Sequence, residues 1–195
     1  AAETLFVFCS TLLTGPAESL QKKKMSEVSP LTQSFFVKDA SETQKYYDEW
    51  AKTYDQDVRH HDYNGPKYLL ELCHKYVKPT DLILCVGAGT GTEGILLHGA
   101  GFKRLHAHEG SLEMLKEAEK RGVYEDCIFE LLQPNQQSKF KTGHYEAMVC
   151  IGCFVPGGLD ERHLEDLLRT LKPGGTCIIG TREIFVTPKP EMNYP

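Results

Sequence analysis

The sequence predicts a doubly wound α/β fold with a mostly parallel sheet, and three observations lead to that prediction. Short apolar runs of strand length alternate with helical patterns from residue 82 onward. These runs are apolar almost throughout, as strands buried on both faces of a parallel sheet must be. A glycine-rich loop at residues 87–91 follows the first run, at the kind of position where such sheets bind ligands. At 195 residues with 41% hydrophobic content, the chain has the size of one domain.

The first part of the chain is expected to lie outside that domain. Residues 1–38 sustain neither helical nor strand periodicity, so we expect them to be disordered. The chain begins with Ala, and Met25 directly follows a run of three lysines, which gives the hypothesis that residues 1–24 are not native. We therefore expect a folded domain at residues 39–185 and a tail at 186–195.

Two helices are predicted ahead of the sheet. The first runs from Ser41 toward His60, because residues 41–44 read Ser-Glu-Thr-Gln and match a capping box. The second begins at Asn64, carries a proline in its first turn and an apolar stripe at helical spacing, and ends near Val77 before a further proline.

The remaining elements alternate between strand and helix, which implies right-handed crossovers and helices on both faces of the sheet. The predicted strands are residues 82–86, 104–109, 127–132, 145–151 and 176–184. The predicted helices between them are residues 92–98, 111–120 and 160–171.

Charge and hydropathy exclude several classes of partner. The net charge is -5 with a pI near 5.9, and the single dense basic run has no interleaved aromatic residues, so we expect no nucleic acid partner. The longest apolar stretch, at residues 5–13, is too short to span a membrane and has no basic segment before it.

The seven cysteines predict a reducing, cytoplasmic location, because most lie in apolar strand-like runs where a free thiol packs as a small hydrophobe. Cys150 and Cys153 spell CxxC, but a redox pair requires thiols at a helix N-terminus, and residues 145–151 are typical of a strand. A second CxxC or a His pair at ligand spacing is missing, so no metal is expected.

The loop at residues 87–91 carries the main functional signal. Gly87, Gly89 and Gly91 let the backbone turn sharply and approach a ligand without side chains in between. Glu109 ends the next predicted strand, where a carboxylate can accept hydrogen bonds from both hydroxyls of a ribose. Together they indicate a cofactor that contains a nucleoside.

A nicotinamide dinucleotide is the alternative cofactor, because residues 89–94 also satisfy GxGxxG. In a dehydrogenase the first glycine of that motif ends the strand, whereas here the strand-ending glycine is Gly87. The register therefore favours the loop of a methyltransferase.

Residues 41–185 resemble the class I S-adenosylmethionine-dependent methyltransferases, and more closely the methyltransferase-like proteins of the Williams-Beuren syndrome chromosome region. The resemblance is carried by the aromatic segment 47–55, the loop 87–91, residues 105–111 with 114–115, and the Leu-Lys-Pro-Gly-Gly of 171–175. It implies S-adenosylmethionine as methyl donor, a small-molecule or protein acceptor, and a Rossmann-like sheet of seven strands.

The resemblance also implies a set of cofactor-binding residues. Tyr46, Trp50 and Tyr54 would form a lid over the cofactor, although core packing of their helix is an equally good interpretation. The remaining implied contacts are the loop residues Gly87, Ala88, Gly89, Thr90 and Gly91, then Glu109, Gly110, Ser111 and Leu112 at the adenosine, Leu131 and Leu132 at the adenine, and Ile151 and Gly152 at the methionine.

No catalytic residue is assigned. Methyl transfer from a sulfonium requires mainly alignment and a dry pocket, and a base only for some acceptors. His60, His61, His144 and His163 are conceivable bases, but surface or packing roles are the simpler interpretation for each.

Two departures from the family pattern leave three hypotheses open. Cys85 stands where the family usually has an aspartate that helps to hold the loop and the amino end of the cofactor. Only ten residues follow Phe185, so we expect the last two strands of the fold to be absent, in which case the chain is a fragment or its exposed sheet edge invites a partner chain. The chain is thus an active methyltransferase, a weak or inactive binding relative, or a nicotinamide-dependent enzyme.

Overall fold

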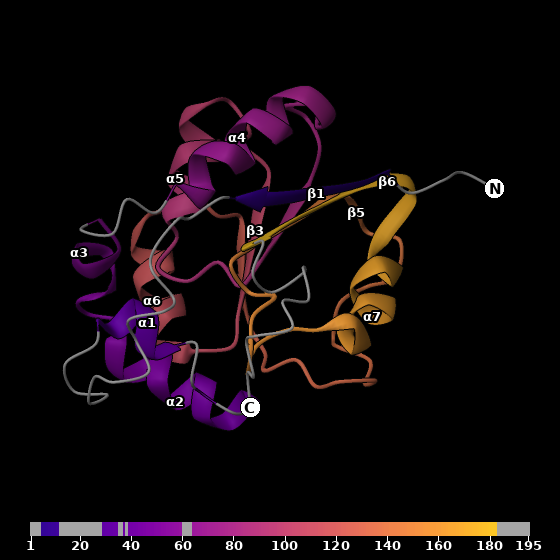
Figure 1. Cartoon of the computed structure of the whole chain (residues 1–195). Helices are drawn as coiled ribbons and strands as arrows, with labels where there is room; N and C mark the ends of the chain where they lie inside the picture. The colour runs from indigo at the N-terminus through magenta and orange to yellow at the C-terminus, as the bar shows by residue number, and fades with distance from the viewer. Residues whose placement is uncertain (1–4, 12–28, 35–36, 38, 60–63, 183–195) are drawn as a thin grey trace.

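The computed structural model describes residues 5–11, 29–34, 37, 39–59 and 64–182. Its centre is one parallel sheet with the strand order β1-β6-β5-β2-β3-β4 (Figure 1). The strands are β1 (Leu5–Thr11), β2 (Ile83–Val86), β3 (Leu105–Glu109), β4 (Asp126–Phe129), β5 (Tyr145–Ile151) and β6 (Leu171–Arg182). Strand order reverses at β2, between β3 and β5, which is where doubly wound sheets bind ligands.

Helices cover both faces of this sheet. They are α1 (Pro30–Gln33), α2 (Ala40–Trp50), α3 (Tyr54–Arg59), α4 (Gly65–Tyr76), α5 (Thr92–Gly99), α6 (Leu112–Lys120) and α7 (Leu164–Arg169), the last preceded by the 3-10 turn Glu161–His163. In Figure 1, α4 and α5 lie on one side of the sheet and α7 lies on the other.

Two apolar clusters fill the space between the sheet and the helices. Ile83 and Cys85 of β2 belong to the cluster that includes residues of α4, α5 and α6. Leu84 and Val86 belong to the opposite cluster, which Leu167 of α7 joins. All four β2 side chains are buried, as the apolar run predicted, because successive side chains of a central strand point to opposite, covered faces.

The predicted helix from Ser41 toward His60 is in fact two helices. The helix N-cap is Asp39, whose side chain accepts a hydrogen bond from Glu42 N at 2.9 Å, so the expected cap at Ser41 is wrong by two residues. The chain turns between α2 and α3, and Asp57 stabilises the turn by accepting hydrogen bonds from the Trp50 indole and the Thr53 hydroxyl. The spacing of apolar residues in the sequence does not predict this turn, because side-chain hydrogen bonds stabilise it.

The expectation of disorder over residues 1–38 is wrong at two places. Residues 5–11 form β1, which pairs in parallel with β6 from Leu5 opposite Thr176 to Thr11 opposite Arg182. Helix α1 follows at Pro30–Gln33. Within the described part of the chain the sheet therefore has six strands, and the edge of β6 that was expected to be exposed is paired. An open edge offers unpaired backbone groups to any nearby segment of strand-forming residues. Met25 and residues 183–195 lie outside the described residues.

Most of the later elements match the predicted ones within one residue. The predicted helix 160–171 is instead a 3-10 turn, Glu161–His163, followed by the shorter α7, Leu164–Arg169, and Leu171 already belongs to β6. Strand β4 ends at Phe129, so the predicted strand is three residues too long. Strand β6 begins at Leu171, opposite Tyr145, and a register shift between Tyr145 and Ala147 accommodates the Lys-Pro-Gly-Gly segment. Its end reaches Arg182, beyond which the predicted strand lies outside the described residues.

Candidate functional site

The glycine-rich loop joins β2 to α5 at the reversal point of the sheet. Strand β2 ends at Val86, so Gly87 is the first residue of the loop, in the register of a methyltransferase loop. Gly87, Gly89 and Gly91 have φ of 65°, 54° and 86°, a region that L side chains rarely adopt. A Cβ on Gly87 would lie 2.2 Å from Cys153 Sγ, whereas a Cβ on Gly89 would meet nothing within 4 Å. The loop is thus packed at its start and open toward the pocket at its centre.

Glu109 lies at the end of β3, facing the loop. Its Oε2 accepts a hydrogen bond from Gly89 N at 2.8 Å, and its Oε1 accepts one from Ser111 N at 2.9 Å. Burial raises the pKa of Glu109, while the backbone N–H groups of Ser111, Gly89 and Gly110 lower it. The carboxylate is therefore held in a fixed orientation beside the loop.

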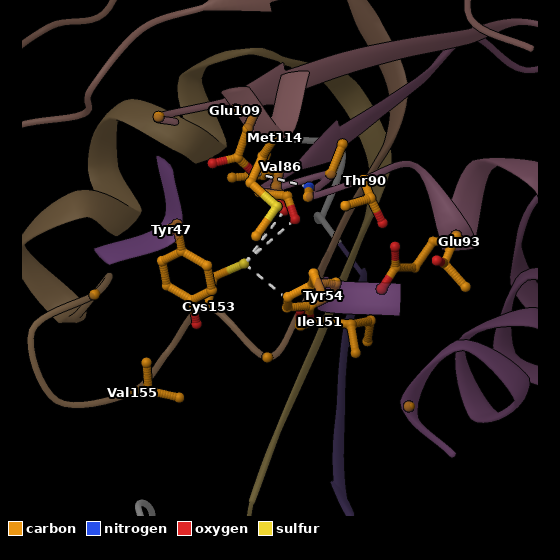
Figure 2. Close-up of a pocket in the computed structure, with 18 of the residues that line it drawn as sticks. Tyr47, Tyr54, Val86, Thr90, Glu93, Glu109, Met114, Ile151, Cys153 and Val155 are labelled. Carbon is orange, nitrogen blue, oxygen red and sulfur yellow. Dashed lines mark hydrogen bonds between the residues drawn. The ribbon is translucent and has the colours of Figure 1, made fainter. Parts of the chain in front are cut away.

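Aromatic side chains from α2 and α3 form a cluster beside the loop. Trp50 lies edge-to-face on Tyr54, with ring centroids 4.7 Å apart, and stacks on Tyr47 at 5.8 Å. Tyr46 completes the cluster, and its hydroxyl donates to Pro30 O at 2.7 Å. Only Tyr47 and Tyr54 of this cluster line the pocket (Figure 2).

Two acidic residues connect α2 and α3, which carry the aromatic cluster, to the glycine-rich loop and α6. Asp48 Oδ1 of α2 accepts hydrogen bonds from Ser111 Oγ at 2.6 Å and from Glu113 N at 3.2 Å, at the first turn of α6. Asp55 of α3 accepts a 2.5 Å hydrogen bond from Thr90 Oγ1 of the loop and pairs with Arg121. The helices ahead of the sheet are thus bonded to both the loop and α6.

The pocket at this edge of the sheet has a volume of about 570 Å³, within the range of cofactor sites. Most of the predicted cofactor-binding residues line it: Tyr54, Gly87, Ala88, Gly89, Thr90, Glu109, Gly110, Leu131, Leu132, Ile151 and Gly152. The residues predicted from the loop, from β3 and from the ends of β4 and β5 are thus brought together at one edge, as parallel strands require.

Five of the predicted residues lie behind the pocket wall instead. Tyr46 and Trp50 pack inside the aromatic cluster, and Gly91 packs against Ala118 of α6. Ser111 is buried and accepts a hydrogen bond from Met114 N as the N-cap of α6, and Leu112 is 41% exposed. Ser111 and Trp50 support residues that face the pocket. The sequence pattern alone does not distinguish such supporting residues from residues that contact a ligand.

Several pocket residues were missed by the sequence analysis. Tyr47 occupies the place that was predicted for its neighbour, and Met114 and Cys153 face the same space (Figure 2). Glu93, in the first turn of α5, also lines the pocket. The sequence signal for Glu93 was its place just after the glycine loop, where a side chain at a helix start can point back toward the ligand.

Cys153 is positioned by three backbone carbonyls. Its thiol lies 3.5 Å from Ile151 O, 3.6 Å from Val86 O and 3.8 Å from Gly87 O (dashed lines in Figure 2). Cys150 and Cys153 are free thiols, with Cys150 on β5 as predicted. Among the described residues, no cluster of His, Cys, Asp and Glu is arranged to hold a metal ion.

The described histidines have structural partners. His163 is buried, and its Nδ1 accepts a hydrogen bond from Asp160 N at 3.1 Å. His144 packs on Tyr145, and neither residue lines the pocket. His108 does line it, and burial lowers its pKa to about 4. His60 and His61 lie outside the described residues.

The comparisons with known proteins agree with this architecture. Residues 83–175 match the family model of a methyltransferase domain. Methyltransferase-like protein 27 of Homo sapiens is 31% identical over 150 residues, which cover 75% of this chain and 60% of that protein. The chain is therefore similar to methyltransferases over its central part, and it spans less than two thirds of the length of this relative.

Solved structures show the same fold with little sequence identity. A SAM-dependent methyltransferase from Aquifex aeolicus superposes with a TM-score of 0.53 at 21% identity, over 75% of this chain and 80% of that one. The [4+2]-cyclase SpnF superposes with a TM-score of 0.57 at 16% identity, over 73% of this chain and 60% of that one. The fold by itself thus does not determine the chemistry. Within the described residues, no helix is both long and apolar enough to cross a bilayer.

Proposed function

We propose that this domain binds S-adenosylmethionine beside the glycine loop and transfers its methyl group to an acceptor. The observation that carries the proposal is the carboxylate of Glu109, which the N–H groups of Gly89 and Ser111 hold in place at the pocket wall. Each of its oxygens retains a further lone pair, which a ribose hydroxyl can use. The similarity to a human methyltransferase-like protein supports the same class of cofactor.

The shape of the pocket fits this cofactor. The open side of Gly89 leaves room for the backbone to approach the ligand closely. Leu131 and Leu132 supply an apolar wall for an adenine ring, next to Glu109 and its ribose. Ile151 and Gly152, at the end of β5, lie on the side where the methionine portion would bind.

When bound, the cofactor supplies a methyl group on a sulfonium that is already activated. The residues of this chain orient it and exclude water. Tyr47 and Tyr54 present aromatic rings to the pocket, and aromatic faces attract a cation. Burial raises the pKa of the Tyr47 hydroxyl, so the side chain stays neutral.

Replacing the ribose acid tests the proposal. Glu109→Ala should weaken S-adenosylhomocysteine binding by roughly tenfold to a hundredfold, the loss expected for one charged hydrogen-bond pair. Calorimetric titration measures this. Glu71→Ala is the matched control, because Glu71 is exposed on α4 and does not line the pocket. Equal affinities for wild type and Glu109→Ala would remove Glu109 from the site.

Cys85 favours a second candidate, a cofactor-binding protein with weak or no transfer activity. Its thiol is 2% exposed, and burial raises its pKa well above the ordinary value, so it supplies no negative charge at neutral pH. Incubating the protein with S-adenosylmethionine and a panel of acceptors separates the two candidates. Formation of S-adenosylhomocysteine supports transfer, whereas binding without turnover supports the second candidate.

A reducing compartment such as the cytoplasm fits the thiols. Cys73 and Cys177 are buried, and burial raises the pKa of each to about 12. Such thiols are inert as long as the domain is folded. Alkylation of the native protein should therefore spare both residues, and full reaction of both without unfolding would contradict this packing.

A further inference from the structure

The missing carboxylate at Cys85 leaves the methionine end of the pocket without an acid on β2. Cys85 lies on the central strand β2, one residue before the end of the strand at which the loop begins. Its side chain is buried. Its surroundings include the carboxylate of Glu93, which contributes to raising the pKa of the Cys85 thiol. Cys85 and Glu93 line the same small cavity, which places the two side chains close together.

Glu93 reaches this point from a different element. It lies in the first turn of α5, directly after the loop, and its carboxylate points into the pocket (Figure 2). A small cavity of about 10 Å³ is lined by Glu93, Cys85, Gly87 and Ile151 together, between the ends of β2 and β5. Glu93 therefore lies beside the ends of β2 and β5, whereas the ribose acid Glu109 lies at the end of β3.

The carboxylate of Glu93 has no ion-pair partner among the residues that the structure describes. The other two acids near it are occupied: Glu109 by backbone N–H groups and Asp55 by Arg121 and Thr90. Three carboxylates thus surround one space, and a cation that enters it has one acid free to pair with.

We infer that Glu93 binds the α-ammonium group of the methionine portion of the cofactor, and thereby takes over the role of the acid that is missing at Cys85. This inference rests on the proposed function. A carboxylate and an ammonium at hydrogen-bond distance form a charge-assisted bond, which is about twice as strong as a neutral one. Because the acid comes from α5 and not from β2, the amino end of the cofactor is held from the helix side of the loop.

The charges around Glu93 give the site a pH dependence. Burial raises the pKa of Glu93 to about 7, and the carboxylates of Glu109 and Asp55 raise it as well, while its own backbone N–H lowers it. Cys85 on β2, Cys150 on β5 and Tyr124 also sense Glu93, and all three have raised pKa values and stay neutral. An ammonium binds the ionised form, so affinity should rise as pH rises through 7 and be weakened at pH 6.

Two ligands that differ at the amino end test the inference. S-adenosylhomocysteine carries the ammonium group, whereas 5′-methylthioadenosine has the same nucleoside without it. In calorimetric titrations at pH 8, Glu93→Gln should weaken S-adenosylhomocysteine binding by roughly tenfold to a hundredfold. The same variant should bind 5′-methylthioadenosine within about twofold of wild type, which also shows that it is folded.

Glu109→Ala and a pH series complete the test. Glu109→Ala should weaken both ligands, because both contain the ribose. For wild type, lowering the pH from 8 to 6 should weaken S-adenosylhomocysteine binding more than 5′-methylthioadenosine binding. Below pH 7 the affinity ratio of the two ligands should change by up to about tenfold per pH unit. In Glu93→Gln this difference between the ligands should disappear.

Each outcome is decisive. If wild type binds neither ligand, the proposed function fails. If wild type binds both and Glu93→Gln changes neither, or weakens both equally, the proposed function stands and the role of Glu93 is overturned.

Discussion

At the scale of single residues, His108 shows how burial beside the pocket affects stability. Its Nε2 donates to Glu130 O at 2.8 Å if the proton is on that nitrogen, and Phe140 packs on the ring. Its Nδ1 has no hydrogen-bond partner among the residues that the structure describes. Burial lowers its pKa to about 4. Because the unfolded state takes up a proton near pH 6.5 and the folded state only near 4, the stability from neutral His108 is complete above pH 6.5 and is lost as the pH falls toward 4.

Replacing His108 should flatten this dependence. Between pH 6.5 and 4, the free energy of unfolding of wild type should fall faster than that of His108→Gln, by about 1.4 kcal/mol per pH unit. Urea unfolding at half-unit pH steps measures the two slopes. Parallel slopes would mean that the pKa of His108 is the same in the folded and unfolded states, which contradicts the effect of burial.

Gly87 is restricted both by its φ of 65° and by the Cys153 thiol, 2.2 Å from the position of a Cβ. Gly87→Ala should therefore destabilise the domain by about 2 kcal/mol or more. Adding Cys153→Ala should restore part of the loss, because it removes the contact but not the backbone strain. Gly99→Ala in α5 is the control, since nothing lies within 4 Å of its Cβ. Thermal unfolding measures all four proteins, and a stable Gly87→Ala would contradict this account of the loop.

The residues of the loop and Glu109 could be predicted because their spacing in the sequence reflects a local turn and the end of the next strand. Glu93 and Tyr47 could not, because their role depends on which side chain of a helix faces the pocket. The sequence of α2 places aromatic residues on two faces of the helix, so it does not show whether Tyr46 or Tyr47 faces the pocket. The packing of α2 on α6 determines that Tyr47 does.

At the scale of elements, the carboxylate of Asp48 is one of the contacts that hold α2 over the pocket, and Thr43 Oγ1 of the same helix donates to Gly157 O at 2.6 Å. Asp48 accepts hydrogen bonds from Ser111 Oγ and Glu113 N at the start of α6. Asp48→Ala should free α2, so that its amides exchange hydrogen faster by roughly tenfold, the equivalent of about 1.5 kcal/mol of local stability. Glu49→Ala, at an exposed position on the same helix, should leave exchange unchanged. If both variants exchange alike, Asp48 does not anchor the helix.

Element types followed from the sequence more readily than element ends. The helix from residue 41 was expected to be continuous, but the side-chain bonds of Asp57 stabilise a turn after Trp50 that leaves no trace in the apolar period. Strand β5 was predicted with its observed ends, because Tyr145–Ile151 is an apolar run bounded by His144 and Gly152.

At the scale of the whole molecule, β1 protects the edge of the sheet. It pairs with β6 over seven residues, although it comes from a segment expected to be disordered. A long-range parallel pairing of this kind cannot be derived from local pattern, because the partner strand is distant in sequence and the gain lies in covering an open edge.

Breaking this pairing should expose β6. Proline at both Val7 and Phe8 removes the backbone N–H of two neighbouring positions, and one of these must face β6. The double variant should lose about 1–3 kcal/mol of stability and self-associate, as measured by urea unfolding and sedimentation. Val7→Ile is the control. A monomeric double variant with the stability of wild type would show that β6 does not depend on β1.

The central claim is that the pocket between β2, β3 and β5 binds S-adenosylmethionine through Gly89 and Glu109, and not a dinucleotide. Titrating the wild-type chain with S-adenosylhomocysteine and with NAD in the same calorimeter tests it most directly. The account predicts saturable binding of S-adenosylhomocysteine with one site per chain and no heat of binding for NAD. Saturable binding of NAD without binding of S-adenosylhomocysteine would contradict it.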